Sequence, residues 1–167
     1  MKILPNLPVL ALAGLLVAWT PPAPTKATGC HVDGLLPDSA CTPGAVQTTD
    51  LQLICGSSTS TRRHVTRTVR RAVFEAYGLS PQQAPGAYEV DHLVSLELGG
   101  SNDRANLWPE EAPGFQGKDR VEDELHRRVC SGAISLGDAQ RAIATDWTTA
   151  LQTVARRADD TPPRKDR

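Results

Sequence analysis

The side chains best suited to chemistry lie in the middle of the chain, where an Asp91–His92 pair is followed by Asn102, Asn106 and Lys118. A histidine can act as a general base near neutral pH because its unperturbed pKa is about 6.5. A carboxylate such as that of Asp91 is a hard oxygen ligand that suits Mg²⁺ or Mn²⁺. An imidazole and a divalent ion can together deprotonate a water, neutralise a phosphate and assist a departing oxygen. This is the chemistry that phosphodiester hydrolysis requires.

Short apolar runs must position these residues. The run from Tyr88 to Leu98 is rich in strand-forming residues with polar residues partly interleaved, which predicts a strand. Gly99–Gly100 and the polar residues after it predict a loop, and Asn106 to Trp108 predicts a short returning strand that ends at Pro109. A charged stretch from about 118 to 129 predicts a helix. The expected order is strand, loop, strand, helix.

This order, with these residues, resembles the HNH family of endonucleases, also called the ββα-metal family. The resemblance rests on Asp91–His92, Gly99–Gly100, Asn102, Asn106–Leu107 and Lys118, in this order and spacing. It covers about residues 86–131 and extends more loosely to a secreted bacterial variety of the family. The resemblance implies an α+β fold with a small ββα-metal core. An N-terminal arginine-rich helix and a C-terminal packing helix would flank this core, and disulfides would cross-link the fold.

The resemblance also implies a role for each residue. His92 would be the general base, and Asn106, fourteen residues later, would pin the loop and orient the imidazole. Lys118 would meet phosphate oxygens as a positive charge. Asp91 would bind the divalent metal ion, for which Mg²⁺ is the first choice and Mn²⁺ or Zn²⁺ are alternatives. Asn102 is a second candidate for orienting the imidazole, although capping of the loop explains it equally well.

The chain departs from the family at the third metal ligand. The family usually has a His or Asn before the lysine near the start of the helix, but the sequence here reads GFQGKDR. An oxygen from Gln116, Asp119 or Glu122 would have to replace it, and Asp119 is the preferred candidate. The alternative is that Lys118 and Asp119 simply form the start of a surface helix.

An arginine cluster precedes the central motif. Val65, Val69 and Val73 recur at helical spacing and predict a helix from Thr61 to Tyr77, which Gly78 would end. Off this apolar stripe lie Arg62, Arg63, Arg67, Arg70 and Arg71. They form either a solvated helix face or a basic surface for nucleic-acid phosphates. The second interpretation is slightly preferred, because the cluster stands out in a chain that is acidic overall.

The first 27 residues are typical of a secretory signal peptide. The uninterrupted apolar run Val9–Trp19 is too short to span a bilayer comfortably, and small residues follow it up to Ala27. An uncleaved anchor is the alternative. The full chain has a net charge of −1, and cleavage would remove Lys2 and Lys26 and leave −3. We therefore expect a secreted or periplasmic protein that has no membrane attachment after cleavage.

Four cysteines follow this signal, namely Cys30, Cys41, Cys55 and Cys130. An even number in an exported protein favours two disulfides, and the sequence does not choose among the three pairings. No two cysteines are spaced as CxxC, so the structural zinc site of many HNH proteins is not expected.

The remaining segments complete the expected organisation. Residues 28–60 are rich in Pro, Thr, Ser and Gly and predict an irregular segment, in which a short strand around Leu51–Cys55 is an option. Residues 61–157 would form the nuclease domain, closed by a helix from Ser135 to about Arg157. Residues 158–167 are polar and predict a disordered tail.

Two functional interpretations follow. The preferred one is a secreted, metal-dependent endonuclease that acts on DNA, or on RNA as well, with little sequence preference, because nothing in the chain resembles a module for reading base edges. The competing one is a non-catalytic, disulfide-stabilised binding protein that has lost the third metal ligand. His31, His64 and His126 are assigned no catalytic role. GxGxxG, P-loop, GxSxG and HExxH motifs are absent, so dinucleotide, NTP, serine-hydrolase and zincin chemistries have no support.

Overall fold

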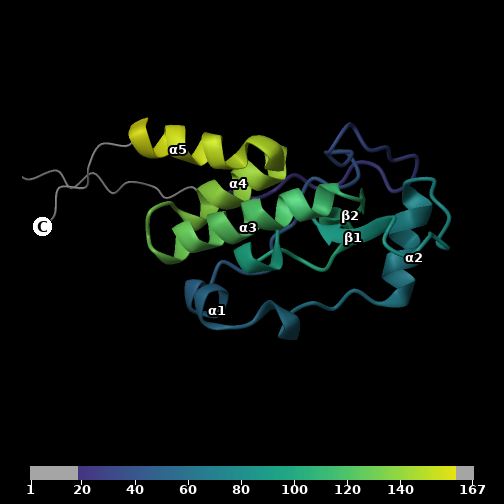
Figure 1. The fold of residues 1–167 in the computed structure, drawn as a ribbon, viewed down its shortest axis with the longest axis horizontal. Coiled ribbons are helices and arrows are strands. Elements are labelled where there is room, and N and C mark those ends of the chain that lie inside the picture. The colour runs from purple at the N-terminus through teal and green to yellow at the C-terminus, as the bar shows by residue number, and fades with distance from the viewer. Residues whose placement is uncertain (1–18, 161–167) are drawn as a thin grey trace, which may run out of the picture.

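The computed structural model describes residues 19–160 (Figure 1). The first 18 residues of the predicted signal peptide, and most of the predicted tail at 158–167, lie outside the described residues. The described chain has an α+β fold with one two-stranded sheet, several helices and two disulfides. None of its helices is long and apolar enough to cross a bilayer.

The sheet pairs β1 (Tyr88–His92) with β2 (Leu107–Glu111) in antiparallel register. The long helix α3 (Gly114–Cys130) follows, so the expected order of strand, loop, strand and helix is confirmed. The prediction that Pro109 ends the second strand is wrong, because Pro109 pairs with Val90 inside β2. A two-stranded sheet tolerates proline there, because each strand has a free edge where a missing N–H costs no ladder hydrogen bond.

The two faces of this sheet are covered by different helices. On one face, Val90 and Leu107 pack against Val73 and Phe74 of α2 (Arg67–Ala76). On the other face lies Asp91, whose side chain contacts α3 through Lys118. Because side chains alternate along a strand, Asp91 and His92 point to opposite faces of the sheet.

The loop between the strands is stabilised by hydrogen bonds from a buried side chain. The predicted strand does not continue to Leu98, because residues Leu96–Leu98 form a 3₁₀ turn. Asn106 is fully buried, and its side-chain oxygen accepts the N–H of Val94 at 2.8 Å while its amide group donates to the carbonyls of Val94 and Ser101, each at 2.9 Å. A Cβ on Gly100 would lie 1.8 Å from the Val94 carbonyl oxygen, so only glycine fits this approach.

The arginine-rich helix is shorter than predicted. The hydroxyl of Thr66 accepts the N–H of Val69 at 3.2 Å and caps the first turn, so α2 begins at Arg67. The prediction that Arg62 and Arg63 lie on this helix is therefore wrong, because both precede it in an irregular stretch.

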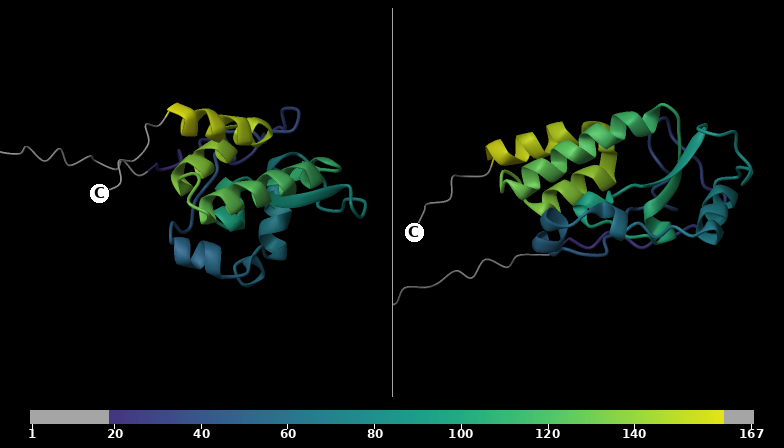
Figure 2. Two further views of the ribbon diagram at one scale, coloured as in Figure 1. Left: turned by 60° about the vertical axis from the view of Figure 1, so that its left-hand side comes forward. Right: turned by 60° about the horizontal axis from the view of Figure 1, so that its bottom comes forward.

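The C-terminal region is also divided. The predicted single helix is two helices, α4 (Leu136–Asp146) and α5 (Ala150–Asp160), joined by the 3₁₀ turn Trp147–Thr149. The backbone of Asp146 is extended, and its carboxylate accepts the N–H of Thr148 at 2.9 Å, which starts a new turn. Helices α3, α4 and α5 contact one another and lie together, with α1 and α2 on the other side of α3 (Figures 1 and 2).

The N-terminal segment is mostly irregular, as expected, but its predicted strand is a helix. α1 (Leu51–Gly56) starts after Asp50, whose carboxylate accepts the N–H groups of Gln52 and Leu53 at 2.9 and 3.3 Å. An Asp cap of this kind favours a helix, and it overrides the strand propensity of the apolar residues that follow.

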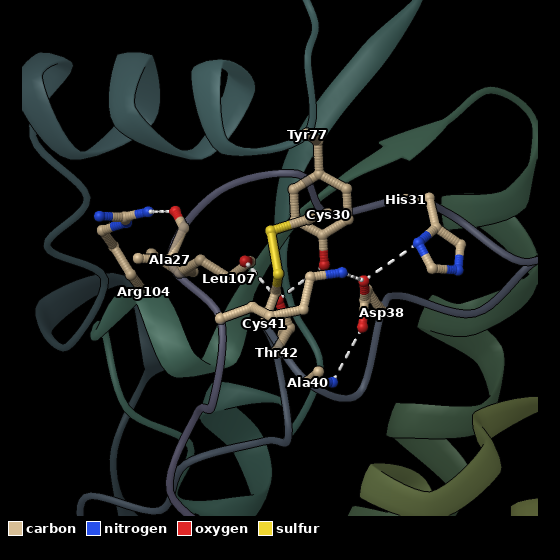
Figure 3. The surroundings of a disulfide bond; sticks show 11 residues. Ala27, Cys30, His31, Asp38, Ala40, Cys41, Thr42, Tyr77, Arg104 and Leu107 are labelled. Atoms are coloured by element: carbon tan, nitrogen blue, oxygen red, sulfur yellow. Dashed lines mark hydrogen bonds and ion pairs between the residues drawn. A yellow bond between two sulfur atoms is a disulfide. The ribbon is translucent and has the colours of Figure 1, made fainter.

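Two disulfides are present, as predicted, and they pair Cys30 with Cys41 and Cys55 with Cys130. The first lies beside Tyr77 at the end of α2, and the Tyr77 hydroxyl is 2.8 Å from that of Thr42 (Figure 3). The second joins α1 to the C-terminal end of α3. One disulfide thus closes a loop within the irregular segment, and the other attaches that segment to α3.

Candidate active site

A polar cavity of about 330 Å³ lies beside the end of β1. It is bounded by the start of the interstrand loop, by one face of α3 and by the stretch that precedes α2. Its lining consists of Thr59, Arg63, Asp91, His92, Ser95, Leu96, Glu97, Asp119, Glu122 and Asp123. Five of these ten residues are carboxylic acids, so the cavity is strongly acidic.

The imidazole of His92 is held in one tautomer. Its Nε2 lies 3.1 Å from Oδ1 of Asn102, and the same oxygen accepts the backbone N–H of His64 at 2.9 Å. The amide nitrogen of Asn102 donates to the carbonyl of Arg62 at 2.9 Å, which fixes the orientation of the amide. Because Oδ1 can only accept, Nε2 carries the proton and Nδ1 keeps its lone pair.

This lone pair is not used in any hydrogen bond among the described residues, and Nδ1 of His92 is itself buried. Burial lowers the pKa of His92, and it outweighs the opposing effects of the Asn102 hydrogen bond and of Asp91. The imidazole is therefore neutral at pH 7, which is the state that a general base needs.

The two asparagines divide the work that the sequence assigns to Asn106. Asn106 pins the loop, as predicted, but all of its side-chain hydrogen bonds go to backbone groups of other residues. The hydrogen bond to the imidazole comes from Asn102 instead. Sequence reasoning had no signal to rank Asn102 first, because the direction of a side chain in an irregular loop depends on the folded loop.

Lys118 is placed differently from the prediction. It is fully buried, and its ammonium donates to Oδ2 of Asp91 at 2.7 Å, to the carbonyl of His92 at 2.6 Å and to the carboxylate of Glu122. The structure therefore holds Lys118 away from any phosphate in solvent. Its contacts instead fix the Asp91–His92 backbone and the carboxylate of Asp91.

Asp91 remains ionised in this arrangement. Burial by itself would raise the pKa of Asp91, but the ammonium of Lys118 outweighs it and holds that pKa below its usual value. The other oxygen, Oδ1, lies 3.9 Å from the guanidinium of Arg63, which also lines the cavity. Asp91 thus presents a fixed negative charge at the cavity wall.

Two glutamates lie next to Asp91: the half-buried Glu122, which the sequence analysis named as a possible replacement ligand, and the buried Glu110, which it missed. Burial, followed by the charge of Asp91, raises the pKa of Glu110 and of Glu122 to about 8 in each case, although Lys118 opposes the rise. Both glutamates are therefore protonated at pH 7, and the buried ammonium of Lys118 is balanced by the ionised Asp91. The i, i+4 spacing of Lys118 and Glu122 was an available signal, whereas Glu110 is recognisable only once the strand pairing is known.

The predicted second metal ligand, Asp119, lies on the wall of the same cavity. Asp119 is exposed at the cavity wall, and its pKa is raised first by partial burial and then by Asp91. Burial likewise raises the pKa of Glu97. Carboxylates that raise one another's pKa gain from a bound cation, and hard oxygen donors of this kind suit Mg²⁺ or Mn²⁺ better than Zn²⁺.

The five arginines separate into three groups. The Nη1 of Arg62 donates to the carbonyl of Leu96 at 2.6 Å, so this half-buried arginine supports the interstrand loop. Arg63 lines the cavity. The remaining three are exposed on α2, namely Arg67, Arg70 and Arg71. Only Arg63 and these three are placed to meet a ligand.

The comparisons with known proteins leave the site to be interpreted on its own geometry. Comparison of the chain with models of protein families, with curated proteins and with solved structures finds no significant match. The combination to be explained is a neutral imidazole with a free Nδ1 beside a cavity in which carboxylates outnumber cations.

Proposed function

We propose that the protein is an exported, divalent-metal-dependent endonuclease of the HNH type that hydrolyses phosphodiester bonds of DNA, or of RNA as well. The observation that carries this proposal is the tautomer of His92. Its Nε2–H is held by Asn102, which leaves Nδ1 unprotonated and without a partner in a ring that lines an acidic cavity. A binding protein has no need for a buried, neutral and precisely oriented imidazole.

The residues of the chain would share the work as follows. Nδ1 of His92 would take the proton of the attacking water, and Asn102 would keep the ring in the required tautomer. Asp91 and Asp119 would hold the divalent ion, which when bound supplies charge neutralisation at the phosphate and at the departing oxygen. Arg63, on the same cavity wall, would attract the phosphate group.

Lys118 has a different role in this proposal from the one that the resemblance implies. Its hydrogen bonds to Asp91 and to the carbonyl of His92 make it a positioning residue. It would keep the metal-binding carboxylate ionised and in place, because a buried ammonium next to a carboxylate favours the charged form of the acid.

The substrate would be recognised through its backbone. The exposed arginines of α2 precede the strand that carries Asp91 and His92, and they can neutralise phosphates without reading sequence. Two of them already make partial contacts within the helix. The guanidinium of Arg70 lies 5.2 Å from the centre of the Phe74 ring, and Arg71 lies 3.7 Å from Glu75. Weakly engaged arginines of this kind remain available to a nucleic acid.

One observation favours a second candidate, a non-catalytic nucleic-acid-binding protein. Oδ2 of Asp91 is already occupied by the Lys118 ammonium, and the third ligand position of the family lacks its His or Asn. An internal ammonium in this place can substitute for a metal ion. The unpartnered Nδ1 of His92 has no purpose in this alternative, so the catalytic proposal explains more of the site.

Metal dependence separates the two candidates. Purified oxidised protein should degrade supercoiled plasmid with Mg²⁺ and lose this activity in EDTA. Asp91→Ala and Asp119→Ala should each require more Mg²⁺ for half-maximal cleavage, whereas Glu111→Ala, which removes an exposed carboxylate outside the cavity, serves as the matched control. Plasmid binding without cleavage at any concentration of Mg²⁺ or Mn²⁺ would favour the binding protein.

A further inference from the structure

A second group of metal-ligating side chains lies around the disulfide between α1 and α3. Cys55 comes from the end of α1, while His126 and Cys130 lie one turn apart on α3. The two sulfur atoms and a ring nitrogen of His126 all lie within 4.8 Å of one another. This is the one such compact group of His, Cys, Asp or Glu in the part of the chain that the structure describes.

The imidazole of this group is already held by a neighbour. Nε2 of His126 lies 3.2 Å from the carbonyl oxygen of Ile54, so Nε2 carries a proton and Nδ1 keeps its lone pair. Histidines that bind metals usually donate their other ring N–H to such a carbonyl or to a carboxylate. The His126 ring is therefore oriented and in the tautomer that a metal ligand requires.

We propose that reduction of the Cys55–Cys130 disulfide creates a zinc site in which Cys55, His126 and Cys130 are the ligands and water takes the fourth position. A dithiol reductant supplies two electrons and two protons, the S–S bond breaks, and two thiols form while the reductant is oxidised to its own disulfide. Zinc then displaces both thiol protons into solvent and binds the two thiolates and the imidazole.

The chemistry and the access both suit zinc. Two thiolates with an imidazole form a donor set typical of tetrahedral Zn²⁺, and a water in the fourth position is common. Two sulfurs bound at about 2.3 Å lie roughly 3.8 Å apart, so the sulfurs of the disulfide must separate by only about 1.7 Å. Cys55 and Cys130 are both exposed, so the reductant and the ion can reach them. The ion would keep α1 attached to α3 after the covalent bond is lost.

Cobalt provides a direct test, because thiolate-to-Co²⁺ charge-transfer absorption reports sulfur ligands specifically. The full chain is reduced with tris(2-carboxyethyl)phosphine and titrated with Co²⁺, and zinc is then added to displace the cobalt. We expect one equivalent of thiolate-bound Co²⁺ in the reduced protein and none in the oxidised protein. Cys30→Ser/Cys41→Ser should bind the same amount, which assigns the signal to the Cys55–Cys130 pair.

The histidine distinguishes this site from chelation by two thiols alone. His126→Ala should weaken zinc binding at least tenfold, while His64→Ala, which removes an exposed imidazole outside this group, should leave it unchanged. Circular dichroism of the reduced protein, recorded with zinc present throughout, should match that of the oxidised protein. No charge-transfer band on reduction, equal affinity in His126→Ala, or unfolding despite zinc would each overturn the proposal.

Discussion

The unit from Tyr88 to Cys130 and the segment at residues 28–60 are held together by different means. In the first, buried polar side chains bind backbone groups, as Asn106 does in the interstrand loop and Lys118 does at the carbonyl of His92. In the second, the chain is mostly irregular; the Cys30–Cys41 disulfide closes a loop within it, and the Cys55–Cys130 disulfide attaches it to α3. The cavity therefore depends on a few internal hydrogen bonds, whereas its surroundings depend on oxidation.

The largest effect should come from removing the buried ammonium. Lys118→Met leaves the carboxyls of Asp91 and Glu122 buried without their shared partner, and breaking a buried pair costs about 3–5 kcal/mol. Urea denaturation should show this loss. Arg120→Met, an exposed change on the same helix, should shift stability by no more than about 0.5 kcal/mol. A stable Lys118→Met variant would mean that the cluster does not hold the site.

Disulfide removal should affect the second region almost as strongly, and the two bonds should differ. Cys55–Cys130 closes a loop of 75 residues, and Cys30–Cys41 closes a loop of 11. The chain-entropy argument gives about 4.5 kcal/mol for the long loop and about 3 kcal/mol for the short one. Thermal unfolding of the two paired Cys→Ser variants, without metal, measures this order. A larger loss from the short loop would show that local packing near Tyr77 outweighs chain entropy.

Asn106 and Asn102 should differ in whether their loss affects mainly stability or mainly cleavage. Asn106→Ala removes four hydrogen bonds to backbone groups in the core and should cost about 3 kcal/mol, because buried groups are left unpaired. Asn102→Ala should cost less stability, because the side chain is only half-buried, but it frees the imidazole. The cleavage rate of Asn102→Ala should fall by more than the loss of folded protein accounts for. If both variants lose activity only in proportion to unfolding, Asn102 does not orient the base.

The buried Glu110 should make the stability of the fold depend on pH. The pKa of Glu110 is about 8 in the folded protein, well above its value of about 4.5 when unfolded, so the folded state binds more protons between these two values. Its contribution is fully present below pH 4.5 and is lost as pH rises to about 8. Glu110→Gln should therefore flatten the fall in stability over this window. Glu111→Gln, at the exposed neighbouring position, should retain the slope.

The outcome shows which features can be inferred from local sequence. The strand, loop, strand and helix order and the two disulfides could be predicted, because apolar runs, a Gly–Gly turn and an even cysteine count are local signals. The division of the last helix at Asp146 and the start of α2 after Thr66 were missed, because both depend on a single capping side chain. Apolar periodicity continues through such caps, so it gives no indication of them.

The features of the site that depend on distant contacts were harder to infer. Lys118 looks like a surface residue in sequence, and only the packing of α3 on the sheet brings it to Asp91. Asn102 reaches His92 because the interstrand loop folds back on the stretch that carries Arg62 and His64. Residue types were thus enough to select His92 and Asp91 as candidates. The residues that set their protonation and orientation could be identified only from the tertiary structure.

The most direct test of the central claim is the single-turnover cleavage rate of His92→Ala at saturating Mg²⁺, measured beside the wild type and His64→Ala. His64 is a matched control, because only its backbone N–H contacts Asn102. We predict that His92→Ala lowers the rate at least about 100-fold, the contribution typical of a general base, while the fold remains intact by circular dichroism. His64→Ala should cleave at the wild-type rate. Near-normal cleavage by folded His92→Ala would contradict the assignment of His92 as the base.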